Sequence, residues 1–249
     1  MLRSIRPNMG RFKDPPKPPK PEQLKTDKAA GICYVAYGEK AVQSCEVSLK
    51  SAKKIHPGIQ VAVISDHKIP GADVSILQDE MDVGAREYKT QVYQYSPFEY
   101  TLYLDADTIV VGHLQAGFAA LEAGWDVAAA LDYRQTIGRI DHLPQNDIDA
   151  CVSMIGTGEY PHLNTGMLFF RKCPEVKALY SLWHREWEVF HYRDQGAFVR
   201  AVFQSEAKVW TLAWQWNTHR PEKAAHILHL HHQVDRQFTG NSQQWQRVR

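Results

Sequence analysis

The sequence predicts an α/β protein whose mostly parallel sheet is flanked by helices. Near the start of the folded region, residues 31–37 and 60–66 are short apolar runs, and residues 40–55 between them carry apolar side chains at helical spacing. This strand–helix–strand order predicts two parallel strands joined by a right-handed crossover. Two further apolar runs, at 101–105 and 126–132, alternate with helical patterns in the same way. We therefore expect a doubly wound sheet.

The helix expected at 40–55 precedes the Pro57-Gly58 pair, which ends it before the next strand. Two more helices are expected, at 83–95 and at 114–123, one before and one after the strand at 101–105. The side chains that define the first helix recur every three or four residues. They are Val42, Cys45, Leu49 and Ala52.

The second half of the chain continues the pattern less regularly. Residues 133–160 are polar and contain glycines, so we expect a loop-rich insertion there. Residues 166–170 form another strand-like run, and 174–190 predict a helix with Pro174 in its first turn, where proline is tolerated. The elements together predict one Rossmann-like domain with a mixed, mostly parallel sheet.

The chain has two parts of different composition. Residues 1–28 are basic and rich in proline, and such a segment cannot build a core, so we expect an extended or disordered tail. Residues 29–249 carry the periodic apolar patterns and are expected to form a single domain.

Composition excludes some classes of protein. The 29 Lys and Arg residues nearly balance the 28 Asp and Glu residues, so no basic field favours nucleic acid. No apolar run is long enough for a transmembrane segment, and a cytoplasmic protein is expected, with peripheral membrane contact left open. The scattered cysteines predict reduced thiols. They are Cys33, Cys45, Cys151 and Cys173.

Two carboxylates follow the apolar run at 101–104. Asp105 and Asp107 are separated only by Ala106, and the end of a parallel strand is where ligands of open α/β sheets bind. Carboxylate oxygens suit Mn²⁺ or Mg²⁺, and an ion held there would neutralise a diphosphate. The alternative interpretation is a strand that ends in an Asp-rich turn.

A histidine-rich segment lies near the end of the chain, at 226–232. His229 is a candidate nitrogen ligand from a distant strand, and His231 is the alternative because both would share one face of that strand. A mixed oxygen and imidazole shell favours Mn²⁺ over Mg²⁺.

Four segments together resemble a known family. Residues 102–108, Leu-Tyr-Leu-Asp-Ala-Asp-Thr, resemble the Asp-x-Asp segment of nucleotide-sugar glycosyltransferases with the GT-A fold, and most of all family 8, the glycogenin and bacterial galactosyltransferase group. Segments 164–169, 193–196 and 225–230 are similar to that group's later motifs and occur in the same order. One departure is that the Gly-x-x-Lys-Pro-Trp ending typical of the family is absent after His229.

The resemblance implies a role for each candidate residue. Asp194 and Gln195 are implied at the reacting sugar, although Asp194 as a helix N-cap is a competing interpretation. Sugar or acceptor contacts are expected from Asp132 and Trp216. Donor binding is expected from Ala36, Tyr37, Asp66, Lys89, Asp105 and Asn164, and metal binding from Asp105, Asp107 and His229.

The sequence therefore predicts a Mn²⁺- or Mg²⁺-dependent, hexosyltransferase-like glycosyltransferase. The resemblance implies a UDP-sugar donor, an unidentified glycan, protein or small-molecule acceptor, and retention of configuration. One alternative is a haloacid-dehalogenase-type phosphatase with Asp105 as nucleophile and Asp107 as acid/base. Against it, two strand–helix units precede the motif and no later strand ends in paired acidic residues. Another alternative is a non-catalytic nucleotide- or glycan-binding protein.

Overall fold

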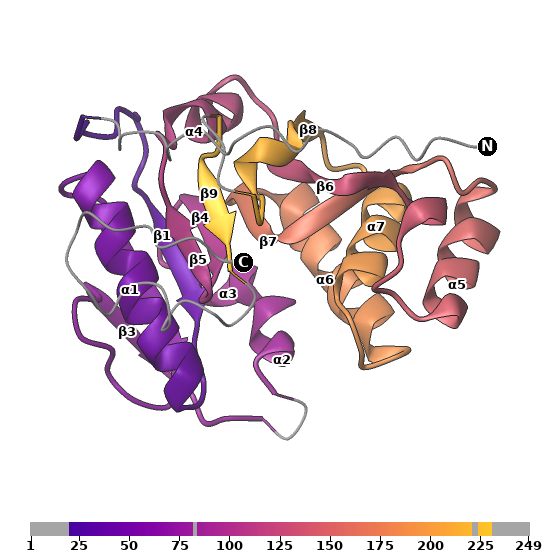
Figure 1. Cartoon of the computed structure of the whole chain (residues 1–249), viewed down its shortest axis with the longest axis horizontal. Helices are drawn as coiled ribbons and strands as arrows, with labels where there is room; N and C mark the ends of the chain where they lie inside the picture. The colour runs from indigo at the N-terminus through magenta and orange to yellow at the C-terminus, as the bar shows by residue number, and fades with distance from the viewer. Residues whose placement is uncertain (1–19, 82–83, 221–223, 231–249) are drawn as a thin grey trace, which may run out of the picture.

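The computed structural model describes residues 20–81, 84–220 and 224–230. In this part of the chain, seven strands form one sheet in the order β3-β2-β1-β4-β7-β6-β8, and β5 pairs with β9 in a small second sheet (Figure 1). The strands of the large sheet are β1 (Ala30–Val35), β2 (Gln60–Ser65), β3 (Val74–Leu77), β4 (Tyr100–Asp105), β6 (Val127–Thr136), β7 (Pro161–Arg171) and β8 (Val209–Leu212).

The sheet is mixed and mostly parallel, which confirms the predicted fold class. Strands β3, β2, β1 and β4 are parallel neighbours, whereas β7 runs antiparallel between β4 and β6. The central strands read as nearly continuous apolar runs because both faces of the sheet are covered. Alternate residues of β1 therefore enter two different cores, with Ile32 on one face and Cys33 on the other.

Helices cover each face of the sheet. Helices α1 (Glu39–Ile55) and α4 (Gln115–Glu122) supply the core on one face. Helices α6 (Pro174–Glu188) and α7 (Gln195–Gln204) supply the core on the other, where Trp183 is fully buried. Truncation of a tryptophan buried in this way costs about 3–5 kcal/mol, so α6 is firmly attached to the sheet.

The prediction of one continuous helix at 83–95 is wrong. The structure has two single turns, α2 (Arg86–Lys89) and α3 (Val92–Tyr95). The hydroxyl of Thr90 donates to the carbonyl oxygens of Arg86 and Glu87, and such local bonding competes with helix propagation.

The loop-rich insertion predicted at 133–160 is also wrong. Strand β6 continues to Thr136, a short 3₁₀ turn η1 (Ile137–Arg139) follows, and helix α5 spans Gln145–Ile155. Gly156 ends α5 with a φ of 88°, the left-handed conformation that favours glycine after a helix. The polar residues of this segment conceal a narrow apolar stripe. That stripe is Ile148, Cys151, Val152 and Ile155, which pack together.

Residues 20–28, which composition groups with the tail, contact the domain. The backbone N–H of Glu22 donates to the carbonyl of Ile55 at 2.9 Å, and that of Lys25 donates to Oε1 of Gln115 at 2.8 Å. Leu24 packs against the core. Residues 1–19 of the predicted tail lie outside the described part of the chain.

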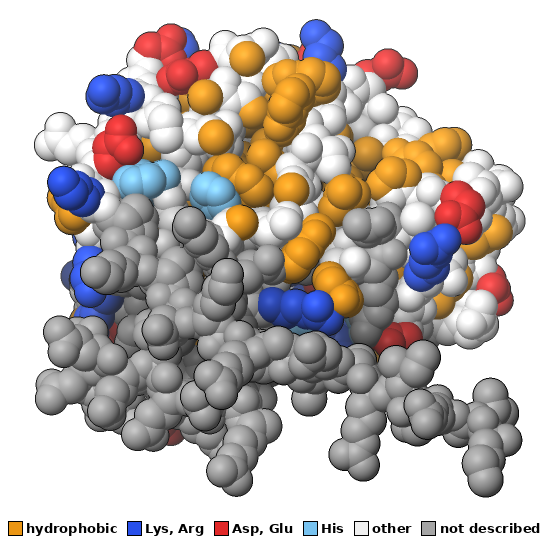
Figure 2. Space-filling view, turned by 45° about the horizontal axis from the view of Figure 1, so that its top comes forward, with side chains coloured by type: hydrophobic (Ala, Val, Ile, Leu, Met, Phe, Trp, Pro, Cys, Tyr) orange, Lys and Arg blue, Asp and Glu red, His pale blue; other side chains and the backbone are white. Residues whose placement is uncertain are grey.

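The surface view shows a band of hydrophobic side chains with charged side chains around its margins (Figure 2). At the β8 edge of the sheet, the ring of Trp125, which follows α4, lies 5.0 Å from that of Trp210 in β8. No described helix combines the length and the hydrophobicity that crossing a bilayer requires.

Candidate active site

A cavity of about 1020 Å³ opens at the carboxyl ends of β1 and β4. Parallel strands deliver their terminal side chains to the same edge of a sheet, and ligands of open α/β sheets bind there. The antiparallel strand β7 contributes Asn164, Thr165 and Gly166 to the lining, and α7 contributes its first residue, Gln195. Most of the polar groups predicted from sequence line this cavity. They are Lys89, Asp105, Asp107, Asp132, Asn164, Asp194, Gln195 and His229.

Asp105 is held at the end of β4 by two buried groups. The hydroxyl of Tyr103 donates to its Oδ1 at 2.6 Å, and Nζ of Lys89 lies 2.9 Å from the same oxygen. Burial by itself lowers the pKa of Lys89, but the carboxylates of Asp105 and Asp194 raise it above its ordinary value. Lys89 is therefore a fixed cation in the cavity wall.

Asp194 faces the cavity although it precedes α7. Its side chain makes no capping bond to the helix, so the N-cap interpretation does not describe that side chain. Instead, Oδ2 accepts a 2.6 Å hydrogen bond from Thr165 and lies 3.0 Å from Nζ of Lys89, while Arg86 approaches Oδ1 at 3.4 Å. Burial raises the pKa of Asp194, but Lys89 and Thr165 outweigh it and lower the pKa to about 2.

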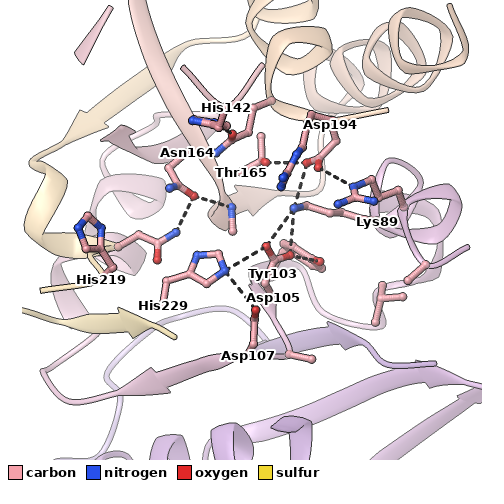
Figure 3. Close-up of a pocket in the computed structure, with 18 of the residues that line it drawn as sticks. Lys89, Tyr103, Asp105, Asp107, His142, Asn164, Thr165, Asp194, His219 and His229 are labelled. Carbon is pink, nitrogen blue, oxygen red and sulfur yellow. Dashed lines mark hydrogen bonds and ion pairs between the residues drawn. The ribbon is translucent and has the colours of Figure 1, made fainter. Parts of the chain in front are cut away.

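Asp105, Asp107 and His229 meet at the opposite side of Lys89 (Figure 3). Nε2 of His229 lies 3.1 Å from Oδ1 of Asp107 and 3.8 Å from Oδ2 of Asp105. Each residue offers one ligand atom within 4.8 Å of the others. Two carboxylate oxygens and one imidazole nitrogen fit a Mn²⁺ ion. The alternative ligand His231 lies outside the described residues.

Strand pairing explains how His229 reaches the carboxylates. Strand β5 (Thr108–Val110) pairs antiparallel with β9 (Ile227–His229), and Thr108 is opposite His229. The backbone N–H of Leu230 donates to the carbonyl oxygen of Asp107 at 2.9 Å. The two-stranded sheet therefore fixes the register that places the histidine beside the acidic pair.

Gly166 makes room for His229. A Cβ atom at this position would lie 2.6 Å from Cε1 of the imidazole, which is closer than real Cβ contacts. Beside it, Oδ1 of Asn164 accepts hydrogen bonds from the backbone N–H of Gly166 at 2.9 Å and from Nδ2 of Asn217 at 2.7 Å. Asn164, which lines the cavity, thus links β7 to Asn217.

Gln195 is the first residue of α7, and its Oε1 lies 2.5 Å from Nε2 of His142. His142 comes from the segment predicted as an insertion loop, so sequence analysis did not identify it as a site residue. Asp132 and His162 lie next to it, and the three offer ligand atoms within 4.8 Å of one another. Burial lowers the pKa of His162 to about 4.

Of four further residues predicted to contact a ligand, only one lines the cavity. Tyr37 lines the cavity, and its ring stacks on Tyr88 at 5.3 Å. Ala36 is fully buried in the core and is not part of the lining. Asp66 is exposed, pairs with a neighbouring histidine and is not part of the lining. Trp216 is a buried core residue and is not part of the lining. Its ring stacks on that of His226, with centroids 3.9 Å apart.

Two more residues in the cavity wall were missed by sequence analysis. Tyr103 shares a face of β4 with Asp105, and the two-residue period of a strand could have revealed it. Thr165 binds Asp194 across a long sequence separation, for which the sequence carries no signal.

Comparison with known proteins establishes the class of fold. No protein-family model matches the sequence, and no curated protein matches it significantly. Solved structures of glycosyltransferases do match in three dimensions, at identities that establish the fold alone. The chain therefore has the GT-A fold that its motifs predict.

Three of these structures show the extent of the similarity. Mouse xyloside xylosyltransferase 1 in its apo form matches with a TM-score of 0.55 and 12% identity, over 80% of this chain and 97% of that chain. The galactosyltransferase LgtC, in complex with donor and acceptor sugar analogues, has a TM-score of 0.52 and 15% identity, over 80% and 86%. The bifunctional glycosyltransferase WbbM has a TM-score of 0.56 and 12% identity, over 89% and 47%.

Proposed function

We propose that this protein is a metal-dependent glycosyltransferase that moves a sugar from a nucleoside diphosphate donor, with UDP-sugars favoured, to an acceptor hydroxyl. The observation that carries the proposal is the position of Asp105. On one side Asp105 contacts the buried ammonium group of Lys89. On the other side it lies close to the carboxylate of Asp107 and the imidazole of His229. A diphosphate leaving group needs positive charge of this kind along one side of the cavity.

Asp105, Asp107 and His229 would hold the metal ion. Their two oxygens and one nitrogen fit Mn²⁺ better than Mg²⁺, which prefers an all-oxygen shell. When bound, the ion supplies positive charge that stabilises the diphosphate as it departs. Tyr103 orients Asp105 by hydrogen bonding to one of its oxygens, which keeps the carboxylate turned toward this position.

Asp194 and Lys89 would bind the donor on the other side. Asp194 is ionised over the physiological pH range because its pKa is about 2, so its oxygens accept hydrogen bonds from sugar hydroxyls. Lys89, which also lines the cavity, holds this carboxylate in place through their 3.0 Å ion pair. The exposed guanidinium of Arg86, next to Asp194, adds a cation at the entrance.

Gln195 would act at the reacting carbon. Its side chain is neutral, so it stabilises positive charge at the anomeric carbon through its amide oxygen rather than forming a stable covalent ester. This supports retention by departure and attack on the same face, the outcome that the family resemblance implies. In LgtC, a glutamine-to-glutamate variant is described as an active-site mutant, so a glutamine belongs to the active site of that transferase.

The acceptor would enter past Asp132 and Tyr133, which belong to β6 and line the cavity. The guanidinium of Arg220 lies 4.0 Å from the centre of the Tyr133 ring, and Trp214 packs against that ring edge-on. An aromatic face of this kind stacks on the apolar side of a sugar ring, whereas Asp132 accepts hydrogen bonds from its hydroxyls.

Calorimetry with UDP tests the proposal. We expect binding in the presence of Mn²⁺ and a loss of affinity of at least tenfold after EDTA treatment. A screen of UDP-sugars should then show slow release of UDP without an acceptor. Equal affinity for UDP with and without Mn²⁺ would show that the nucleotide does not bind through a metal ion. Turnover of p-nitrophenyl phosphate that is lost in Asp105→Asn would identify the protein as a phosphatase instead.

A further inference from the structure

A second group of potential ligands lies across the cavity from Asp107 and His229. It consists of Asp132 from β6, His142 from the turn before α5, and His162 from β7. Each offers one ligand atom, and the three atoms lie within 4.8 Å of one another. In Figure 3, His142 lies at the opposite edge of the cavity from His229 and Asp107. The two groups share no residue.

His162 is the member that most requires an explanation. Its side chain is completely buried, and neither ring nitrogen meets hydrogen-bond geometry with a described residue, although the Gln195 side chain is near enough to act on its pKa. A buried polar group left in this state destabilises the fold, because it has lost its hydrogen bonds to water without gaining full replacements. Asp132, also buried, and His142 both lie close enough to interact with its imidazole, so a ligand placed between the three would satisfy the buried nitrogen.

The donor set indicates which ligand fits. Two imidazoles and one carboxylate form a nitrogen-rich group, and three ligands of these types are typical of Zn²⁺ sites that keep a fourth position open. Asp132 and His142 line the cavity, so the open position would face it. Metal-binding histidines usually donate their other ring N–H to an oxygen, and Nε2 of His142 lies 2.5 Å from Oε1 of Gln195.

We propose that Asp132, His142 and His162 form a second metal site that binds Zn²⁺ and is separate from the Asp105–Asp107–His229 group. Through His142, the ion fixes the position of the Gln195 amide. The site goes beyond the proposed glycosyl transfer, because its existence does not depend on which donor or acceptor the protein uses.

Cobalt substitution tests the second site directly. The full chain, purified without a histidine tag and treated with EDTA, is titrated with Co²⁺ and followed by visible absorption. A four-coordinate site gives intense bands, whereas an oxygen-rich six-coordinate site gives weak ones. We expect the intense bands in the wild type and in the double variant Asp107→Asn/His229→Gln, which removes only the first group. We expect them to disappear in His142→Gln and in His162→Gln.

His67→Gln is the matched control, because His67 is exposed and contacts neither group. Its spectrum should equal that of the wild type. His162 is buried and its variant can unfold, so circular dichroism accompanies each spectrum and the half-buried His142 decides the outcome if His162→Gln does not fold. Bands that persist in folded His142→Gln, that vanish in Asp107→Asn/His229→Gln, or that never form would each overturn the proposal. UDP binding is measured in a separate experiment. The second metal site and the proposed glycosyl transfer can therefore fail independently of each other.

Discussion

Lys89 and Asp194 form an ion pair of 3.0 Å although they come from opposite halves of the chain. Both side chains are almost completely buried, with 8% and 7% of their surface exposed. The same ammonium group also contacts Asp105, so one cation compensates two carboxylates in the cavity wall. This arrangement joins the side of the cavity proposed to bind the donor to the side proposed to bind the metal.

Replacement of Lys89 should destabilise the fold strongly. Lys89→Met leaves two buried carboxylates without their cation, and breaking a buried ion pair in this way costs about 3–5 kcal/mol. The free energy of unfolding, measured in urea, checks this value. Lys50→Met is the matched control, because Lys50 pairs with Glu46 on the surface, where the effect should stay below about 1 kcal/mol. Equal losses in the two variants would contradict the structural role assigned to Lys89.

Stability should depend on acid pH through Asp194. Its pKa is lowered from 3.8 to about 2 in the folded protein, so its contribution is complete above 3.8 and is lost as the pH falls toward 2. Urea unfolding of the wild type and of Asp194→Asn across this window measures the contribution. The difference in free energy between the two proteins should shrink as the pH falls. A constant difference would show that the neighbours of Asp194 do not lower its pKa in the folded protein.

Asp107→Asn should abolish the part of UDP binding that depends on Mn²⁺. The substitution keeps the shape of the side chain but removes the charge that faces His229 and the metal position. Calorimetry with and without Mn²⁺ checks this expectation. Asp66→Asn is the control, since Asp66 is exposed and outside the cavity lining. If both variants retain the Mn²⁺ effect, another group holds the ion.

Gln195→Ala should lower turnover much more than donor affinity. A group that stabilises only the transition state changes kcat, while ground-state binding stays nearly the same. Donor hydrolysis kinetics and calorimetry measure the two effects, and Gln204→Ala at the far end of α7 serves as control. The anomeric configuration of the product, determined by NMR, decides the mechanism. Inversion would transfer the catalytic role to Asp194 as a general base.

Much of the fold was predictable from local patterns. The apolar runs of β1, β2 and β4 and the helical spacing of α1 are strong signals, because strands covered on both faces must be continuously apolar. The acidic pair after β4 was predictable for the same reason, since the carboxylates interrupt a run that is otherwise fully buried. Helix α5 was not, because its first three residues are polar and its packed apolar side chains form only a narrow stripe.

The sequence by itself determined which chemical groups are present and which strands carry them. Asp105 and Asp107 were identifiable from their position at a strand end, and His229 was one of two candidate histidines in a late apolar segment. Only the tertiary structure decided which groups meet. The β5–β9 register brings His229 to Asp107, and the packing around β7 brings Lys89 to Asp194 and His142 to Gln195. Such contacts join residues far apart in the chain, and no local propensity or period encodes them, because they form only when the sheet and its helices are assembled.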